Sequence, residues 1–473
     1  MTQRCRRRPQ SNPVTKGARL NKAAEIGAEQ KSLTKQVLGL ALPALGALIA
    51  EPVFVLIDSA VVGRLGANEL AGLALASAVL MTAVGLNIYL AYATTAAVAR
   101  HVGAGNRKAA LSLGVGGLWL ALGLGVVLAV AGWLSADWLM AALNADSNIA
   151  PHALSYLLWS LPGLPGMLVV LAATGVLRGL LDTRTPLVVA VLGAIFNAAM
   201  SIILVHPVGM GVGGSGAATA LTQILMGIAL TIVVLKHAKV ARASWRPRLA
   251  GIVLNFKAGM PLFVRTLSLR AAFLSTVFVA TELGAVTLAA HQIVNAWWGF
   301  LAFGLDALAI AAQALVGQML GAGNESGAHE LTRRLARWGI WLGLVLGVVT
   351  AAIAKLITPL FTSDPNVQTA AFWGLVVAGA VTGIGGYVFV LDGVLIGAGD
   401  GVYLARIGLV TLTAFLPMIG LVYLYAPGGT TGLVWIWVAF GGGYMAARAL
   451  ANGLRARGDK WTQNGESLDV EVE

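Results

Sequence analysis

Gly103-Ala104-Gly105-Asn106 recurs letter for letter at Gly321-Ala322-Gly323-Asn324, 218 residues further along the 473-residue chain. The same offset relates two further pairs of segments: Pro43 with Pro261, and Gly175-Val176-Leu177-Arg178-Gly179 with Gly393-Val394-Leu395-Ile396-Gly397. Because separate anchors keep one offset without a gap, the chain is a duplicated unit. Each Gly-Ala-Gly-Asn copy is expected to end a helix, with Gly or Asn in the left-handed backbone conformation.

The composition indicates a membrane protein. Apolar residues make up 58% of the chain and charged residues 11%, whereas soluble domains carry about 25% charged residues. At about 20 apolar residues per span plus loops, there is room for roughly a dozen helices, six in each repeat. Because six is even, the second repeat enters the membrane in the same sense as the first. The sequence therefore predicts an all-α polytopic membrane protein with 12 transmembrane helices in two parallel six-helix repeats, typical of a transporter.

The basic residues gather on one predicted side of the membrane. Of the 32 Lys and Arg residues, 28 fall in the tails and loops of that side, and the positive-inside rule places both termini in the cytoplasm. The net charge of +12 then reflects topology, and no nucleic-acid partner is expected. We expect a multi-pass monomer of the cell (plasma) membrane. The chain divides into a basic cytoplasmic tail (1–35), an N-lobe (36–236), a cytoplasmic linker (237–257), a C-lobe (258–455) and a polar C-terminal tail (456–473).

Motifs of catalysis and of ATP hydrolysis are absent from the sequence. It contains no GxxxxGK[ST] phosphate loop, HExxH, CxxC or GxSxG motif, so neither ATP-driven export nor an enzyme is expected. Cys5 is the only cysteine, which excludes an intrachain disulfide and a thiolate metal cluster. We expect no cofactor and no metal site, only H⁺ or Na⁺ as a coupling ion.

Two acids, Glu51 and Asp58, fall inside the first predicted span, and the first repeat has no base at membrane depth. Ionisable groups there are costly and are functional hypotheses by default. Low dielectric favours the neutral form of a carboxyl group, so such a group can load and release a proton as its surroundings alternate between wet and dry. The alternative is that one or both only hold the bundle together, accepting hydrogen bonds from polar side chains in neighbouring spans: Asn87, Asn197, Ser201 or Gln223.

The second repeat buries charges of both signs, Arg265, Arg270, Asp306 and Asp392. These side chains can neutralise each other in an internal ion-pair network, or they can line a substrate cavity. Arg265 and Arg270 are five residues apart, roughly 140° around a helix, so one partner cannot serve both.

Pro43 and Pro52 both fall inside the first span. A proline leaves a carbonyl without its backbone partner and permits a bend. We expect both positions to act as hinges.

Several segments together resemble the multidrug and toxic compound extrusion (MATE) family. They are Leu40-Ala41-Leu42-Pro43-Ala44-Leu45, the run from Ala50-Glu51-Pro52 through Asp58 to Val62-Gly63-Arg64-Leu65-Gly66, and Ala289-Ala290-His291-Gln292-Ile293. Arg265, Phe303-Gly304-Leu305-Asp306-Ala307-Leu308 with Ala311-Ala312-Gln313, and Leu391-Asp392-Gly393 through Gly399-Asp400 look like its DinF branch. The resemblance covers residues 36–452.

The resemblance implies two six-helix bundles that form a V, and antiport of protons or sodium against organic cations. In proton-coupled relatives, an aspartate 15 residues after a helix-bending proline takes the proton, which matches Asp58 after Pro43. A helix 5 asparagine that joins that site matches Asn197. The acid found four residues later in some relatives is Ser201 here, so that part of the network is altered.

The coupling ion and the substrate leave alternatives open. Relatives coupled to sodium carry a helix 7 glutamate where Leu269 and Arg270 stand here, which favours proton coupling through Asp58, with Glu51 beside it. The expected function is secondary antiport that exports organic, often cationic or amphipathic compounds. The alternatives are a sodium-coupled exporter of the same fold, a flippase for a lipid-linked precursor, for which Arg265 and Arg270 would line the cavity, and a major-facilitator exporter. The last would carry a Gly-x-x-x-Asp-Arg-like signature, and the loop Arg100–Lys108 has no Asp.

Overall fold

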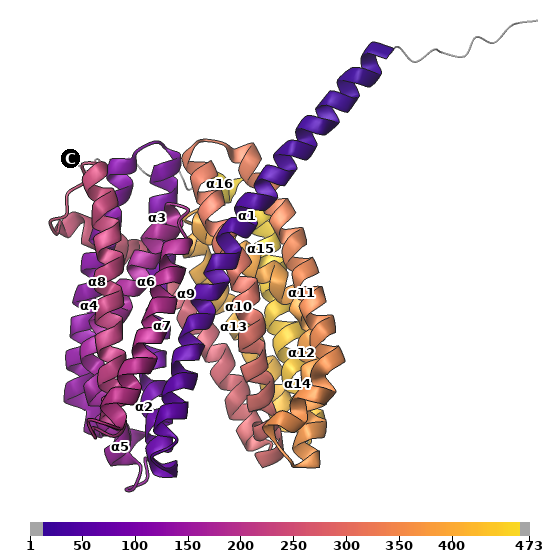
Figure 1. The fold of residues 1–473 in the computed structure, drawn as a ribbon. Coiled ribbons are helices and arrows are strands. Elements are labelled where there is room, and N and C mark those ends of the chain that lie inside the picture. The colour runs from indigo at the N-terminus through magenta and orange to yellow at the C-terminus, as the bar shows by residue number, and fades with distance from the viewer. Residues whose placement is uncertain (1–12, 464–473) are drawn as a thin grey trace, which may run out of the picture.

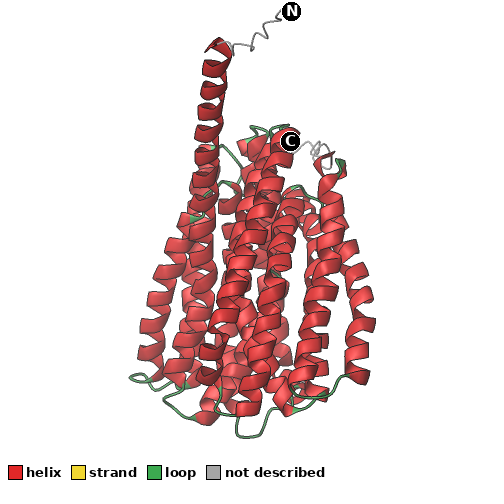
Figure 2. Ribbon diagram, turned by 90° about the vertical axis from the view of Figure 1, so that its right-hand side faces the viewer, coloured by secondary structure: helices red, strands yellow, loops and turns green. Residues whose placement is uncertain are grey.

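The computed structural model describes the backbone of residues 13–463 and the side chains of residues 32–50 and 52–462. Over these residues the chain is helical, and short loops join the helices at the two ends of the bundle (Figure 2). Within the described part of the chain, twelve helical segments are long and apolar enough to cross a membrane, as the composition predicts.

The N-lobe contains the first six spans, two of which are made of consecutive helices. Its elements are α1 (Pro13–Val62), α2 (Ala67–Leu86), α3 (Tyr89–Gly103), α4 (Arg107–Ala142), α5 (Ala150–Ser160), the 3-10 turn η1 (Leu161–Gly163), α6 (Leu164–Gly179), α7 (Arg184–Val205) and α8 (Val212–Val240).

The C-lobe contains the other six spans and a short terminal helix. Its elements are α9 (Leu249–Glu282), α10 (Ala285–Gly321), α11 (Glu325–Phe361), α12 (Pro365–Gly397), α13 (Gly401–Tyr425), α14 (Thr430–Val438), the π-helix η2 (Ala439–Met445), α15 (Ala446–Arg457) and α16 (Lys460–Gln463).

Prolines have different effects in different spans. Pro162 lies in η1, where the backbone tightens into a single 3-10 turn between α5 and α6, as expected where a helical hydrogen bond is lost. Pro43 and Pro52, the two predicted hinges, lie within α1, which continues through both. The first part of α1 projects beyond the bundle (Figure 1).

The two Gly-Ala-Gly-Asn turns have the same geometry. Gly105 and Gly323 take positive φ angles of 75° and 71°, as expected for residues that follow a helix end. Asn106 and Asn324 begin the next helices, because each side chain accepts a hydrogen bond of 2.9 Å from a backbone N–H three residues later. The asparagines therefore act as N-caps. We call the end of the bundle that carries these turns and the α8–α9 loop the basic face.

The hydrophobic core shows how the lobes meet. One cluster of buried residues joins both lobes, from Val37 and Leu111 to Leu315 and Val394. Three further clusters are confined to single lobes, one in the C-lobe and two in the N-lobe. Figure 1 shows the lobes converging at the basic face and separating toward the opposite face, which is the expected V.

Glycine allows α3 and α10 to cross at the convergence of the lobes. A Cβ atom at Gly103 would overlap the backbone carbonyl of Gln318, and one at Gly321 would overlap that of Arg100. These two contacts, which we call the glycine crossing, are related by the 218-residue offset. Gln318 also donates a hydrogen bond of 3.0 Å to the Gly179 carbonyl across the lobes. Only glycine permits backbones to approach this closely.

Two segments outside the spans are more ordered than their polarity indicates. The predicted linker 237–257 is helical at both ends, and only residues 241–248 lie between α8 and α9. At the start of the predicted polar tail, Trp461 of α16 is fully buried and packs edge-on against His329. This aromatic contact, together with the hydrogen bond of 3.2 Å from Thr462 Oγ1 to Glu325 Oε2, holds the segment on α11.

Candidate functional site

The Asp58 carboxylate is buried inside the N-lobe, and its side chain contacts are neutral. The residue is 3% exposed. Its Oδ2 atom accepts hydrogen bonds from Thr219 Oγ1 at 3.1 Å and from Tyr156 OH at 3.5 Å. Among the described residues, no Lys, Arg or His makes a salt bridge with it. A buried acid without a cationic partner favours its neutral form.

Polar atoms that lack partners gather around this carboxylate. A cavity of about 30 Å³ is lined by Asp58, Asn197, Gln223 and other side chains. Asn197 Nδ2 donates to Thr219 Oγ1 at 3.4 Å, which links it to the acid. Oxygen atoms of Asp58 (Oδ1), Asn197 (Oδ1), Ser201 (Oγ) and Ser215 (Oγ) are buried without a hydrogen-bond partner. Buried polar atoms without partners are costly, so this group is a candidate site for a proton or a small cation.

Helical spacing explains how these side chains meet. Asn197 and Ser201 are one turn apart on α7, and Ser215, Thr219 and Gln223 follow the same spacing on α8. Residues four apart lie on one face of a helix. Asn197, Ser201 and Gln223 were predicted from the sequence as partners of a helix 1 acid, whereas Thr219, Ser215 and Tyr156 were not. The four-residue repeat of polar side chains would have identified Thr219 and Ser215, whereas nothing in the sequence marks Tyr156.

The other two predicted N-lobe site residues are Asn87 and Glu51. Asn87 lies at the end of α2, where its side chain donates to the Ala83 carbonyl at 2.9 Å. The described hydrogen bonds of Asp58 come from Thr219 and Tyr156, and a hydrogen bond from Asn87 to Glu51 stays a prediction. Glu51 belongs to α1, but its side chain lies outside the described residues.

The C-lobe holds its acid in a different way. Asp392 Oδ2 accepts from Arg265 Nη2 and, at 2.5 Å, from Arg448 Nη2, while Oδ1 accepts from Asn452 Nδ2 at 2.7 Å. Asp392 and Arg448 are each 3% exposed. Two charge-assisted bonds and an amide satisfy this carboxylate, so it forms a buried ion-pair network.

Asp306 lies beside this network. A second, smaller cavity of about 10 Å³ is lined by Asp306, Asp392, Arg265 and Tyr92, among others. Arg178, 8% exposed, interacts electrostatically with Asp306. Three of the four charges predicted inside the C-lobe thus come together, with Arg178 reaching them from the N-lobe.

Arg270 is the fourth predicted charge, and it lies apart from the others. It is exposed, and its guanidinium lies against Gly85 of α2 in the other lobe. The separation from Arg265 follows from the roughly 140° between them on α9.

Arg448, Asn452 and Arg178 were missed as members of this network. All three lie near helix ends, where arginines are expected as basic residues of the cytoplasmic side. The π-helix η2, with Gly441, Gly442 and Gly443, precedes Arg448, and a π segment rotates the residues that follow it. No periodicity argument anticipates such a rotation.

A comparison with protein families identifies the repeat. The family model MatE matches residues 43–203 and again residues 261–421. The two matches begin at Pro43 and Pro261, so each lobe holds one copy. The chain belongs to the MATE family. It is a multi-pass membrane protein and a secondary transporter of small organic compounds, in a family of transporters rather than enzymes.

Relatives of this MATE protein include plant and bacterial proteins. It is 30% identical to Protein DETOXIFICATION 44, chloroplastic, of Arabidopsis thaliana over 439 residues, covering 89% of this chain and 81% of that protein. It is 27% identical to DNA damage-inducible protein F of Escherichia coli, covering 78% and 81%. The bent form of the Vibrio cholerae MATE transporter VcmN superposes with a TM-score of 0.82 at 21% identity, covering 92% and 98%.

Metal-binding side chains are not clustered in the part of this MATE protein whose side chains the structure describes. Among residues 32–50 and 52–462, no group of three or more His, Cys, Asp or Glu side chains has a geometry that could hold a metal ion. The Asp58 cavity is instead lined by one carboxylate with neutral oxygens.

Proposed function

We propose that this MATE protein is a proton-coupled antiporter that exports organic, often cationic compounds, and that Asp58 carries the proton. The observation that supports this most is the contrast between the two buried acids. Asp392 is fixed by two arginines, whereas Asp58 has only hydroxyl donors. A carboxylate without a paired charge can change its protonation state without leaving an opposite charge buried and alone.

The neighbours of Asp58 suit both of its protonation states. Thr219 and Tyr156 donate hydrogen bonds to the ionised carboxylate. The Asn197 Oδ1 atom, unpartnered in the same cavity, can accept a hydrogen bond when a proton is present. Protonation removes a charge from the N-lobe, and that change can favour one arrangement of the lobes over another.

The direction of transport follows from the orientation that we propose. The basic face carries the turns and linker in which Lys and Arg gather, and the positive-inside rule assigns it to the cytoplasm, with both termini. Protons would enter through the opposite face while the organic compound leaves. We propose a monomer in the plasma membrane.

Transport in proteoliposomes tests the assignment. The full chain is reconstituted, and efflux of ethidium is followed under an imposed pH gradient or an imposed sodium gradient. We expect pH-driven efflux in the wild type and its loss in Asp58→Asn. Asp137→Asn is the matched control, because Asp137 is an exposed acid near the opposite face. Undiminished pH-driven efflux in Asp58→Asn would overturn the proposal, and Glu51→Gln tests whether the neighbouring acid shares the proton.

Sodium coupling is the second candidate, because the unpartnered Oδ1 of Asp58 lies among three other buried oxygens without partners, those of Asn197, Ser201 and Ser215. Hard cations prefer such oxygen ligands. Efflux driven by the sodium gradient alone, and lost in Asp58→Asn and Ser215→Ala, would favour this candidate over the proton.

A flippase is the third candidate, and it depends on cationic groups along the pathway. Arg265 is neutralised by Asp392, which leaves exposed Arg270 beside Gly85 of the other lobe. Translocation of a fluorescent anionic lipid in the same proteoliposomes, reduced in Arg270→Gln, would favour this candidate.

A further inference from the structure

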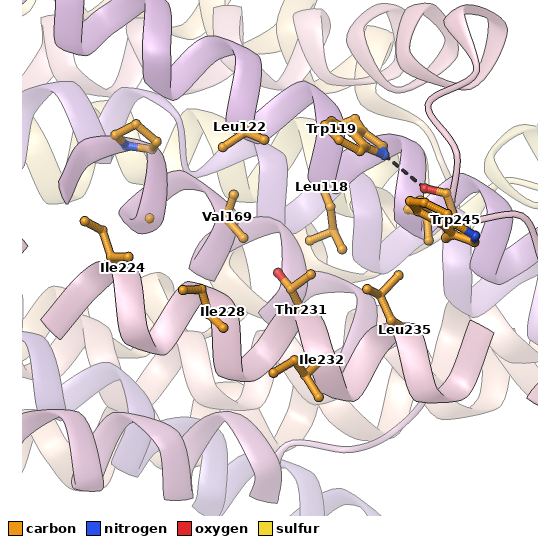
Figure 3. Close-up of a pocket in the computed structure, with 14 residues that line it drawn as sticks. Leu118, Trp119, Leu122, Val169, Ile224, Ile228, Thr231, Ile232, Leu235 and Trp245 are labelled. Atoms are coloured by element: carbon orange, nitrogen blue, oxygen red, sulfur yellow. Dashed lines mark hydrogen bonds between the residues drawn. The ribbon is translucent and has the colours of Figure 1, made fainter. Parts of the chain in front are cut away.

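The outer side of the N-lobe contains an apolar groove between α4, α6 and α8 (Figure 3). Its volume is about 350 Å³, the largest of the cavities described here. The lining consists of apolar side chains apart from Thr231. Several of these side chains are exposed, including Leu122, Ile228 and Ile232. The groove therefore opens toward the space that the bilayer fills around the spans.

The groove runs along the membrane normal. On α8 it extends from Leu235, near the end of the helix at the basic face, to Ile224, near its middle. Eleven residues of helix correspond to about 16 Å. Figure 3 shows Trp119 and Trp245 at one end and Ile224 at the other. The groove thus begins at the membrane surface and ends within the hydrocarbon layer.

Small residues form the floor of the groove. Gly166 of α6 and Gly227 of α8 both line it, and a Cβ atom at Gly227 would lie 3.3 Å from the Gly166 carbonyl oxygen. Because the two helices pack backbone against backbone there, no side chain fills the space above them. An apolar hollow therefore runs along the helices above this contact.

The mouth of the groove lies under the linker. Trp119 Nε1 donates a hydrogen bond of 3.2 Å to the Trp245 carbonyl, which ties the linker to α4. Lys239, Arg242 and Arg246 are exposed next to this contact. Residues 236–257 contain no Asp or Glu. An apolar channel therefore meets a wholly cationic surface at membrane depth, where Trp side chains prefer to lie.

We propose that this groove binds one anionic phospholipid, with an acyl chain between α4, α6 and α8 and the phosphate headgroup on the linker arginines. Close packing of the acyl chain against α4, α6 and α8 provides affinity, since van der Waals contact rather than removal from water drives association inside a bilayer. The linker cations provide preference for a negative headgroup. The site is separate from the Asp58 cavity and does not depend on the proposed function.

Lipid binding to the purified full chain tests the acyl part. Detergent-solubilised protein is titrated with dioleoyl phosphatidylglycerol or dioleoyl phosphatidylcholine, and bound lipid is counted by native mass spectrometry. We expect one tight phosphatidylglycerol per chain. Ile228→Trp, which fills the groove, should weaken binding by about tenfold or more. Ile195→Trp is the matched control, because Ile195 of α7 is 63% exposed and does not line the groove.

The headgroup part has its own variants. Arg242→Gln with Arg246→Gln should reduce the preference for phosphatidylglycerol over phosphatidylcholine by about tenfold. Arg333→Gln with Arg337→Gln removes the same charge from exposed positions of α11 and should leave that preference unchanged.

Three results would overturn the proposal. They are equal binding of both lipids by the wild type, unchanged phosphatidylglycerol binding in Ile228→Trp, and displacement of the lipid by tetraphenylphosphonium, which would mark a substrate site instead. Thermal unfolding checks that each variant is folded, and Thr231→Phe fills the middle of the same groove if Ile228→Trp does not fold.

Discussion

The two lobes share a backbone but differ in what they bury. Gly211 and Gly429, 218 residues apart, both begin a helix with nearly the same dihedral angles, φ 57°, ψ −140° and φ 75°, ψ −141°. At the same offset, polar residues of the Asp58 cluster correspond to residues of the C-lobe core: Asp58 to Thr276, Tyr156 to Gly374, Asn197 to Phe415, Ser215 to Leu433 and Thr219 to Trp437. The N-lobe cavity lies where the C-lobe packs aromatic rings.

The correspondence also holds in the opposite direction. At the same offset, the residues of the C-lobe ion-pair network correspond to uncharged residues of the N-lobe: Arg265 to Ala47, Asp392 to Thr174, Arg448 to Leu230 and Asn452 to Val234. Each lobe therefore has one polar centre, and the two centres occupy different positions in the repeat. The two lobes thus share one backbone frame, while the N-lobe acid Asp58 has neutral partners and the C-lobe acid Asp392 has charged ones.

Removing the C-lobe acid should have the largest effect on stability. Asp392→Ala leaves the guanidinium groups of Arg265 and Arg448 buried without their carboxylate. We expect the free energy of unfolding to fall by about 3–5 kcal/mol, measured by equilibrium unfolding in mixed micelles. Replacing all three side chains together, with Asp392→Leu, Arg265→Met and Arg448→Met, should recover most of the loss. If the triple variant does not recover stability, the network must contribute more to the free energy of unfolding than the pairing of its charges.

Alanine substitutions at the two glycines of the glycine crossing should have equal effects. An alanine at position 103 or 321 would overlap a backbone carbonyl of the other lobe. Overpacking of this kind lowers the free energy of unfolding by about 1–3 kcal/mol. We expect Gly103→Ala and Gly321→Ala to separate the lobes at the basic face by similar amounts, measured by spin-label distances across them. Gly123→Ala is the control, because a Cβ there meets nothing within 4 Å. A response to only one of the two substitutions would show that the crossing is not symmetric.

Loss of a donor to Asp58 should have a moderate effect. Thr219→Val removes the 3.1 Å hydrogen bond to the carboxylate, which is worth about 1 kcal/mol. We expect the pH dependence of ethidium efflux to shift in this variant. Thr276→Val, at the C-lobe position that corresponds to Asp58, should leave that dependence unchanged. Equal shifts in the two variants would contradict the difference between the lobes.

Asp58→Asn should have the smallest effect on stability. The substitution removes a buried charge that has no cationic partner, so we expect a change of less than about 1 kcal/mol in the free energy of unfolding. The same measurement applied to Asp392→Asn provides the comparison, and its loss should be several times larger. Similar losses in both variants would indicate that Asp58 also has a structural role.

Features that repeat along the chain could be predicted from the sequence. The offset between Pro43 and Pro261, the number of spans and the V followed from repetition, apolar length and family resemblance. Asp58 with Asn197, and Arg265 with Asp392, were found because a charge or an amide at membrane depth is conspicuous.

Features that depend on contacts between distant spans could not be predicted. Tyr156 reaches Asp58 across 98 residues of sequence, and an aromatic residue in an apolar span gives no sign of that contact. In the sequence, Arg448 resembles a basic residue at a helix end. In the structure, the π-helix η2 precedes it and its side chain contacts Asp392. The apolar groove depends on Gly166 meeting Gly227, two of 59 glycines that the sequence alone does not distinguish.

The glycine crossing has the form of an isologous interface. Position 103 meets position 318, and position 321 meets position 100, so each site faces the other's equivalent across a local two-fold axis. Such self-complementary contacts are the hallmark of two-fold homodimers. In a dimer of single repeats, one substitution would alter both contacts at once. Within one polypeptide each contact can vary alone. The equivalent positions 100 and 318 already differ, since one is Arg and the other is Gln, whereas the glycines at 103 and 321 are the same.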